Sequence, residues 1–245
     1  MTMLCAAAGH STAGQPVEDA LSWNGRVETD RVSDLGRKPK EVLEFLEIEP
    51  GMRVLDLFSG GGYYTELVSR VVGEEGMVVA HNNQAYVDYA ADALAGRFER
   101  QRLPNVQQVV AEANDLELSP NSFDAALAML TWHDFYYVDE ENGWPAIDRR
   151  LVVGMLCNAL KPGAILGLTD HVALPGSDPE ETARDLHRID PQRIREDLES
   201  GCFRFEGEID ALRNPADDLA RPMFAEGVRG KTDRVVYRFR KVAAE

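Results

Sequence analysis

A run of three glycines between an apolar strand pattern and a helical pattern is the feature that most constrains this chain. The segment covers residues 54–72 and reads VLDLFSGGGYYTELVSRVV. Its first part, VLDLF, is short, apolar and rich in branched side chains, which predicts a buried strand. Its last part repeats apolar side chains at helical spacing, which predicts a helix over 63–72. Glycines at such a junction let a ligand approach the backbone, so the junction predicts a binding site.

Strand and helix patterns alternate through the following segments. Helix patterns lie over 63–72, 84–99 and 146–160, between the strand patterns MRVLDLF, GMVVAHN, NVQQVVA, FDAALAML and AILGLTD. A further helix begins near Pro39 and is ended by Pro50 and Gly51. Nearly unbroken apolar strands separated by helices predict an α/β fold, with a mostly parallel sheet covered on both faces. Two final strand patterns, FRFEGEIDAL and DRVVYRFRK, are expected to pair antiparallel at the sheet edge.

Composition limits the number of domains that the chain can form and the kinds of partner that it can bind. The 245 residues, 44% of them hydrophobic, supply one full core, so we predict a single domain over 21–245 after a mobile leader over 1–20. The net charge of −16 opposes nucleic-acid binding, which needs clustered Lys and Arg. No apolar run approaches the ~20 residues of a membrane span, so no membrane partner is expected. The cysteines, Cys5, Cys157 and Cys202, are scattered without metal-ligand spacing, and we expect reduced thiols in a cytoplasmic protein.

Two common glycine loops do not fit the segment. A P-loop needs a Lys-Ser or Lys-Thr pair after its last glycine, where this chain has Tyr63 and Tyr64. A dinucleotide loop needs a third glycine where this chain has Thr65. LDLFSGGGYYT instead resembles the loop of class I S-adenosylmethionine-dependent methyltransferases. That resemblance implies Asp56 as the acid at the strand end, and it places Gly60 and Gly62 beside the methionine part of the cofactor.

The segments that follow resemble the same superfamily in order. GMVVAHNN places Asn82 where members carry a carboxylate that binds the ribose hydroxyls; the amide oxygen of Asn82 can still accept one hydrogen bond. AEANDLELSPNSFDAALAML resembles the third-strand exit and fourth strand, which implies Glu112 beside the adenine amine and Ala113 offering its backbone. CNALKPGAILGLTD resembles the last helix, turn and fifth strand. The resemblance covers about 41–172 and implies a Rossmann-like class I methyltransferase fold with S-adenosyl-L-methionine (SAM) as cofactor.

The whole chain also resembles a group of predicted bacterial methyltransferases of unassigned substrate. The segments that carry this resemblance are GRKPKEVLEFLEIEPG, GGGYYTEL, HDFYY, LHRID, LRNPADD and RGKTDR. Two nucleic-acid classes are excluded by their missing motifs. DLFSGGG resembles the opening of cytosine-5 DNA methyltransferases, but no cysteine here follows a proline. Amino-methylating enzymes carry Asn/Asp-Pro-Pro-aromatic where this chain has TWHD. We therefore expect a small-molecule acceptor; nothing in the sequence sets the oligomeric state.

Histidines and aspartates follow two neighbouring strands of the predicted sheet. His133 and Asp134 follow the fourth strand, and Asp170 and His171 end the fifth. Ligands of open α/β sheets bind at this edge, and methyl transfer needs a deprotonated nucleophile, for which a histidine steered by a carboxylate is a suitable base. Neighbours on a strand point to opposite sides, so the pairing is expected to be crossed: His133 with Asp170, or His171 with Asp134. We predict that His133 or His171 deprotonates an acceptor hydroxyl. The motif LHRID adds His187, Arg188 and Asp190 to this edge.

No metal site is predicted. The Asp170-His171 pair resembles the metal-binding pair of catechol O-methyltransferase-like enzymes, but Met129 and Leu130 are apolar where those enzymes carry another Asp. Magnesium also prefers oxygen to imidazole. Two alternatives to a methyltransferase stay open. One is a protein of the same fold that binds SAM or S-adenosylhomocysteine (SAH) and acts as a sensor or partner-binding module. The other is an NAD-dependent oxidoreductase.

Overall fold

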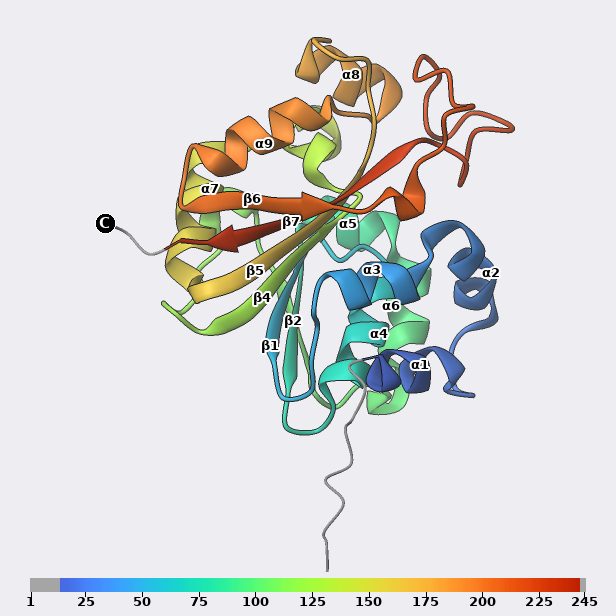
Figure 1. Cartoon of the computed structure of the whole chain (residues 1–245), viewed down its shortest axis with the longest axis vertical. Helices are drawn as coiled ribbons and strands as arrows, with labels where there is room; N and C mark the ends of the chain where they lie inside the picture. Colours follow the sequence, from blue (N-terminus) through green and yellow to red (C-terminus); the bar gives the residue numbers. More distant parts are fainter. Residues whose placement is uncertain (1–13, 243–245) are drawn as a thin grey trace, which may run out of the picture.

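The computed structural model describes residues 14–242, which build one seven-stranded sheet with helices on both faces (Figure 1). The strand order is β3-β2-β1-β4-β5-β7-β6. The strands are β1 (Arg53–Leu57), β2 (Met77–Asn82), β3 (Val106–Val110), β4 (Phe123–Met129), β5 (Leu160–His171), β6 (Phe203–Glu208) and β7 (Arg234–Lys241). β1 to β5 pair in parallel, whereas β7 runs antiparallel to both β5 and β6. The predicted parallel sheet with an antiparallel final pair is confirmed.

The helices follow the predicted pattern with local differences. They are α1 (Gln15–Ser22), α2 (Glu28–Arg37), α3 (Pro39–Phe45), α4 (Tyr63–Val72), α5 (Gln84–Tyr89), α6 (Ala91–Phe98), α7 (Arg149–Ala159), α8 (Pro179–Leu186) and α9 (Pro191–Glu199). The helix predicted over 63–72 is confirmed at both ends, whereas the one predicted over 84–99 breaks at Ala90 into α5 and α6. α7 begins later than expected because the Asp148 side chain caps its first backbone N–H groups.

Alternate strand residues face two apolar clusters, one on each side of the sheet. Val54, which is fully buried, packs with α1, α3 and α4. Its neighbour Leu55 is equally buried in the opposite cluster, with residues of α7, α8 and α9. Burial on both faces explains why the strands read as continuous apolar runs.

Two expectations need correction. Residues 15–20, expected in a mobile leader, belong to α1, which packs on α4 through the buried Val17 and Ala20; residues 1–13 lie outside the described residues. Cys157 and Cys202, which were expected to be reduced thiols, instead form a disulfide, and their Cα atoms are 5.8 Å apart. The fold brings Cys157 of α7 beside Cys202, which precedes β6. The two cysteines are 45 residues apart, so the sequence did not indicate that they would meet. None of the helices in residues 14–242 is long and apolar enough to cross a membrane.

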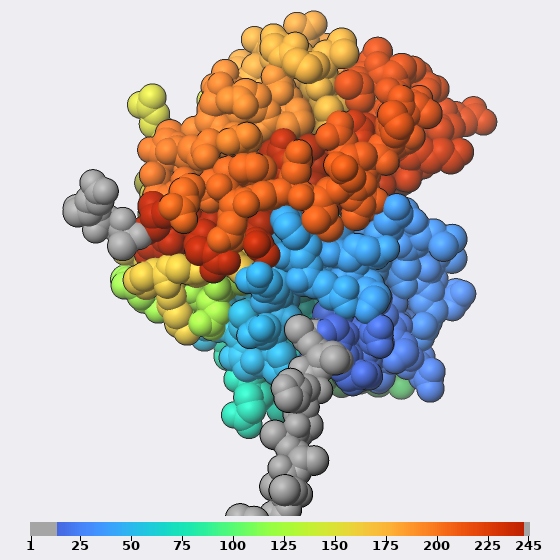
Figure 2. Space-filling model, viewed as in Figure 1, coloured from blue at the N-terminus to red at the C-terminus, as the bar shows by residue number. Residues whose placement is uncertain are grey.

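The long connection between η5 (Asp210–Leu212) and β7 is held to the sheet by a buried ion pair. The side chains of Arg188 and Asp217 are 0% and 2% exposed and form two hydrogen bonds, of 2.7 and 3.1 Å. Asp217 also accepts the backbone N–H of Asp233, so one carboxylate joins the LHRID, LRNPADD and RGKTDR motifs. Figure 2 shows this C-terminal part (orange to red) lying against the N-terminal part (blue), where Arg234 donates to the carbonyl of Gly36.

We expect Asp217→Ala to lower the free energy of unfolding by about 3–5 kcal/mol, because it leaves the buried Arg188 guanidinium unpaired. Urea unfolding followed by circular dichroism measures the change. Asp218→Ala is the matched control, because Asp218 pairs with Arg221 at the surface and both side chains are about half exposed. Its unfolding midpoint is expected to stay at the wild-type value. Equal midpoints for the two variants would contradict the assignment.

Candidate active site

The carboxyl ends of β1 and β4 lie side by side at the centre of the sheet. The chain leaves β1 toward β2 and returns to β4 on the other side, so the strand order reverses between them. In open α/β sheets this reversal leaves a crevice in which ligands bind. The glycine loop follows β1, and the His-Asp segment follows β4. The sequence-predicted cofactor and catalytic groups therefore meet at one edge.

The glycine loop is packed on one side and open on the other. Gly60 has a φ of +56° and Gly62 a φ of +78°, backbone conformations that residues other than glycine rarely adopt. A Cβ atom on Gly61 would lie 2.9 Å from the Cβ of Ala93, so α6 covers that side of the loop. A Cβ atom on Gly60 would meet only the Tyr86 ring, at 4.0 Å. Gly60 is thus the position where a ligand can approach the backbone.

The Asn82 side chain fastens the glycine loop to the end of β2. Its Oδ1 accepts the Gly60 backbone N–H at 2.9 Å, and its Nδ2 donates to the Gly60 carbonyl at 3.1 Å. A carboxylate could accept the first bond but could not donate the second. An asparagine at this position therefore satisfies both backbone groups of Gly60. A cavity of about 390 Å³ borders Asn82 and Ser59, a size that suits a nucleoside-containing ligand.

Asp56 is the last residue but one of β1, and its side chain contacts the first turn of α4. It accepts a hydrogen bond of 2.6 Å from the Thr65 hydroxyl and is 1% exposed. Burial raises the pKa of Asp56 to about 6, although the Thr65 bond lowers it in part. Glu112 and Ala113, expected beside the adenine, follow β3; Glu112 accepts a bond from Asn83, and Ala113 is buried. The cofactor roles of these residues stay predictions.

His133 and Asp170 form the crossed contact that strand geometry allows. His133 lies in the 3₁₀ helix η3 (Trp132–Tyr136), and its Nδ1 is 2.7 Å from Asp170 Oδ1. Asp170 is fully buried and also accepts the backbone N–H groups of His133 and His171, at 2.9 and 2.7 Å. The same carboxylate thus joins the ends of β4 and β5. The other crossed contact, His171 with Asp134, is not formed.

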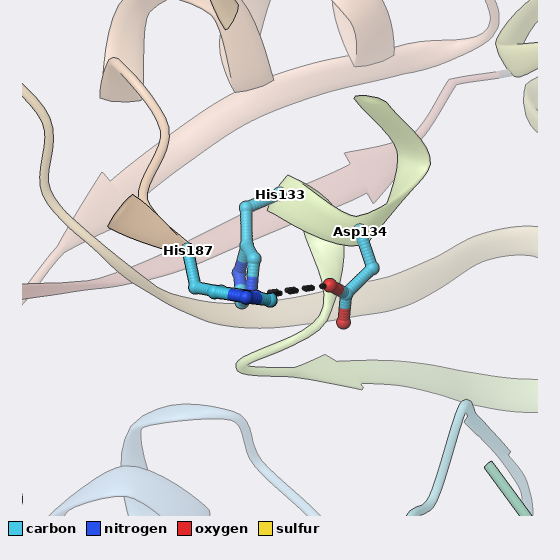
Figure 3. A group of neighbouring side chains, drawn as sticks. All are labelled: His133, Asp134 and His187. Carbon is cyan, nitrogen blue, oxygen red and sulfur yellow. Dashed lines mark ion pairs between the residues drawn. The ribbon is translucent and has the colours of Figure 1, made fainter. Parts of the chain in front are cut away.

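Asp134 brings His187 into the site. Its Oδ1 is 3.3 Å from His133 Nε2 and 3.8 Å from His187 Nδ1, and its Oδ2 accepts a short hydrogen bond from the Tyr86 hydroxyl. Figure 3 shows both imidazoles meeting the Asp134 carboxylate from two different elements. His187 follows α8, with the left-handed φ of 51°. Its neighbours in the LHRID motif serve other contacts: Arg188 in the buried ion pair, and Asp190 as the cap of α9.

The two central histidines have opposite electrostatic surroundings. Burial alone would lower the pKa of His133, but the Asp134 and Asp170 carboxylates outweigh it and raise that pKa to about 9. Burial also opposes ionisation of Asp134, yet His133, His187 and Tyr86 hold its pKa below the usual value. Burial lowers the pKa of His171 well below its usual value, and the nearby positive charges add to that effect. His133 is therefore cationic at neutral pH, whereas His171 is neutral.

Three buried polar atoms at this edge lack a hydrogen-bond partner among the described residues. They are Ser59 Oγ, Thr131 Oγ1 and His171 Nε2, at the carboxyl ends of β1, β4 and β5. The other ring nitrogen of His171 is 2.7 Å from the Thr232 hydroxyl. Buried polar groups nearly always have partners, so unpaired groups grouped at strand ends are suited to a polar ligand. Sequence reasoning missed Tyr86 and Thr232, because each contacts the site from a distant segment that carries no motif for it.

Sequence comparison relates the chain to methyltransferases. Residues 37–115 match the family Protein-L-isoaspartate(D-aspartate) O-methyltransferase (PCMT). The chain is 30% identical over 149 residues to the ubiquinone/menaquinone biosynthesis C-methyltransferase UbiE of Teredinibacter turnerae, covering 60% of this chain and 54% of the relative. It is 28% identical to the ribosomal RNA small subunit methyltransferase H of Nostoc punctiforme, covering 46% of this chain and 35% of the relative. The chain spans about half the length, or less, of the curated relatives it matches.

Structure comparison gives the same fold. A SAM-dependent methyltransferase from Aquifex aeolicus superposes with a TM-score of 0.60 at 23% identity, covering 88% of this chain and 96% of that one. The [4+2]-cyclase SpnF superposes with a TM-score of 0.55 at 20% identity, covering 95% of this chain and 93% of that one. At such identities the likeness concerns the fold alone. The predicted Rossmann-like methyltransferase fold is confirmed.

Asp56→Asn is expected to stabilise the ligand-free protein at neutral pH. The folded-state pKa of Asp56, about 6, exceeds the usual aspartate value of 3.8, so folding favours the protonated form. Burying the charged form costs stability, and this cost grows as the pH rises from about 4 through about 6. Between pH 4 and pH 7.5, the free energy of unfolding of the variant should therefore rise by roughly 3 kcal/mol relative to that of wild type. Urea unfolding of both proteins at several pH values measures the gain; parallel pH profiles would contradict it.

Proposed function

We propose that this chain is a class I S-adenosylmethionine-dependent methyltransferase, which transfers a methyl group from SAM to a hydroxyl oxygen of a small molecule. The observation that supports this most is the meeting of the glycine loop with unpaired polar atoms at one sheet edge. Members of this superfamily use SAM as methyl donor. The match to PCMT and the similarity to UbiE support methyl transfer, and the choice of oxygen rests on the site.

The residues at the ends of β1 to β3 suit the cofactor. Gly60 offers an open backbone beside a cavity that Ser59 and Asn82 border. Asn82 Oδ1 keeps a second lone pair for a ribose hydroxyl while it holds Gly60. We assign Glu112 and Ala113 to the adenine, and Asp56 to holding β1 against α4 beneath the methionine part. When bound, SAM supplies an electrophilic methyl group on its sulfonium.

His171 is the residue we assign as general base. In the tautomer in which Nδ1–H donates to the Thr232 hydroxyl, Nε2 carries the lone pair and lacks a partner. A hydroxyl of the acceptor would donate to Nε2, pass its proton there and direct an oxygen lone pair at the methyl group. Asp170 orients this end of β5 through the His171 backbone N–H. His133 and Asp134 hold the opposite side of the acceptor site.

Charge and burial support a small acceptor. The net charge of −16 opposes an RNA or DNA substrate. The catalytic groups are themselves buried: His133, Asp170 and His171 are at most 3% exposed, which suits a molecule that enters the crevice. One of the relatives is a ribosomal RNA methyltransferase, so an activity screen should include an RNA acceptor for comparison with the small molecules.

One observation favours a second function, that of a SAM- or SAH-binding protein without turnover. The Asn82 amide is already bonded to both backbone groups of Gly60, so it offers the ribose less than a free carboxylate would. The likeness to a [4+2]-cyclase also shows that this fold is compatible with a different reaction. Release of SAH separates the two functions, with a panel of phenols, carboxylates and amines measured against a no-acceptor control.

Calorimetry with SAM, SAH and NAD tests the cofactor. We expect binding of SAM and SAH but not NAD, and loss of both by Gly60→Arg, because the new side chain would project where the backbone is open and strain a φ of +56°. Circular dichroism of the variant checks that it folds. Binding of NAD with no heat from either SAM or SAH would overturn the cofactor assignment.

With an acceptor from the panel, His171→Ala is expected to lower turnover by ~10²–10⁴-fold, the range typical of a general base. SAM affinity should stay unchanged, because His171 is assigned to the acceptor and not to the cofactor. Turnover is measured as SAH released across pH 6–9 under saturating SAM. Wild-type turnover in the variant throughout this range would show that His171 is not the base.

A further inference from the structure

His133, Asp134 and His187 converge as metal ligands do. Within residues 14–242 their ligand atoms all lie within 4.8 Å of one another, and two of the three side chains are buried. The Asp134 Oδ1 atom is the point of convergence, 3.3 Å from His133 Nε2 and 3.8 Å from His187 Nδ1. Ligand atoms around one ion with bonds of about 2.0–2.2 Å lie roughly 3–3.5 Å apart, so only a small adjustment is needed. We propose that these three residues bind a divalent transition-metal ion.

The first support is the way His133 is oriented. Asp170 engages His133 Nδ1 at 2.7 Å, which leaves Nε2 as the nitrogen facing Asp134. Histidine ligands in proteins almost always donate their other N–H to a carboxylate or carbonyl, which fixes the ring and makes the ligating nitrogen more basic. Asp170 is fully buried and also fixed by two backbone N–H groups, so it holds this orientation firmly.

The second support is that the two carboxylate oxygens of Asp134 have different partners. The Tyr86 hydroxyl donates to Asp134 Oδ2, and Oδ1 faces the two imidazoles. The Tyr86 side chain is buried in the apolar cluster, which holds its hydroxyl in place. One oxygen is thereby fixed and the other is presented to an ion.

The third support is access. His187 is the exposed member of the group, with 25% of its side chain accessible, whereas the His133 side chain is 3% exposed. Its ring stacks on Tyr137 and meets the edge of Phe224, with centroids 5.4 and 5.0 Å away. An ion can therefore enter past His187 and bind against a preformed inner pair.

The donor set selects the kind of metal. Two imidazoles and one carboxylate suit Zn²⁺, Fe²⁺ or Co²⁺, whereas Mg²⁺ prefers oxygen ligands. Asp170, one member of the Asp170-His171 pair that resembles a magnesium-binding pair, contacts His133 Nδ1 and thereby orients the His133 ring. The LHRID motif placed His187 at this edge of the sheet, but the sequence gave no sign that its imidazole meets the Asp134 carboxylate, which lies more than 50 residues earlier.

The site would serve the proposed methyl transfer, and this part rests on that function. Three protein ligands leave a coordination position for an acceptor oxygen. A hydroxyl bound to the ion loses its proton more readily, and the His171 ring lies 5.9 Å from the His133 ring, centroid to centroid. The ion would hold and acidify the hydroxyl, and His171 would receive the proton.

Metal binding is tested without any substrate. The full chain, freed of any affinity tag and stripped with EDTA, is titrated with Zn²⁺ in a calorimeter and with Co²⁺ in a spectrophotometer, with Mg²⁺ as the comparison. We expect one ion per chain for Zn²⁺ and Co²⁺, visible Co²⁺ absorption bands typical of nitrogen and oxygen ligands, and no comparable binding of Mg²⁺. No Zn²⁺ or Co²⁺ binding by the folded protein would overturn the proposal.

Variants locate the ion. His187→Ala is expected to weaken Zn²⁺ binding at least about tenfold and to change the Co²⁺ bands, and Asp170→Asn to weaken it about 10–100-fold through the orientation of His133. Asp185→Asn is the matched control, because it removes an exposed α8 carboxylate that pairs with Arg184 and should bind the ion as wild type does. Equal affinities in wild type and His187→Ala would place the ion elsewhere and refute the site.

A separate measurement decides whether the ion takes part in the reaction. SAH release is compared for the stripped protein, the Zn²⁺-loaded protein and loaded His187→Ala. Loss of turnover on stripping and recovery on loading, absent in the variant, supports the catalytic part. Full turnover by the stripped protein refutes that part and leaves the methyltransferase function intact. SAM binding without any turnover, together with Zn²⁺ bound at His187, supports the site while it refutes the proposed function.

Discussion

The buried Asp170 carboxylate is the interaction on which this edge of the sheet depends. It is fully inaccessible to solvent, so its charge must be compensated by hydrogen bonds from the protein. Three donors converge on it: His133 Nδ1 and the backbone N–H groups of His133 and His171. Because these donors come from the ends of two adjacent strands, one side chain sets the distance between the two segments that carry the candidate catalytic groups.

The parts of this architecture that could be predicted are those with a local signal. The helix over 63–72 is marked by its own periodicity and by glycines at both ends. The contact of His133 with Asp170 was one of two crossed pairings that the sequence left open, and the sequence did not choose between them. The parts that could not be predicted depend on residues far apart in the chain. Tyr86 reaches Asp134 across 48 residues, and Thr232 reaches His171 across 61. Neither partner carries a pattern that marks it as more than a core or loop residue.

Asn82 shows how a departure from a family pattern can be explained once its contacts are known. From the sequence it looks like the loss of a ribose-binding charge. In the structure its amide both accepts from and donates to Gly60, which a carboxylate cannot do. On the other side of the loop, Arg97 donates to the Gly61 carbonyl and is paired with Asp30 and Glu66. The loop is thus held from two sides by side chains, which leaves Gly60 positioned for a ligand with little backbone freedom.

The two histidines at this edge illustrate how one fold separates two roles. His133 faces two carboxylates, so its site favours a positive charge, whether that charge is a proton or a metal ion. The His171 ring contacts the Thr232 hydroxyl, and its burial together with the nearby guanidinium groups of Arg188 and Arg234 disfavours a positive charge. Pairs of ionisable groups whose environments push their pKa values apart are typical of sites that divide acid, base and binding tasks. The division arises because the His133 ring lies between the carboxylates of Asp134 and Asp170, whereas the His171 ring contacts Thr232 near two guanidinium groups.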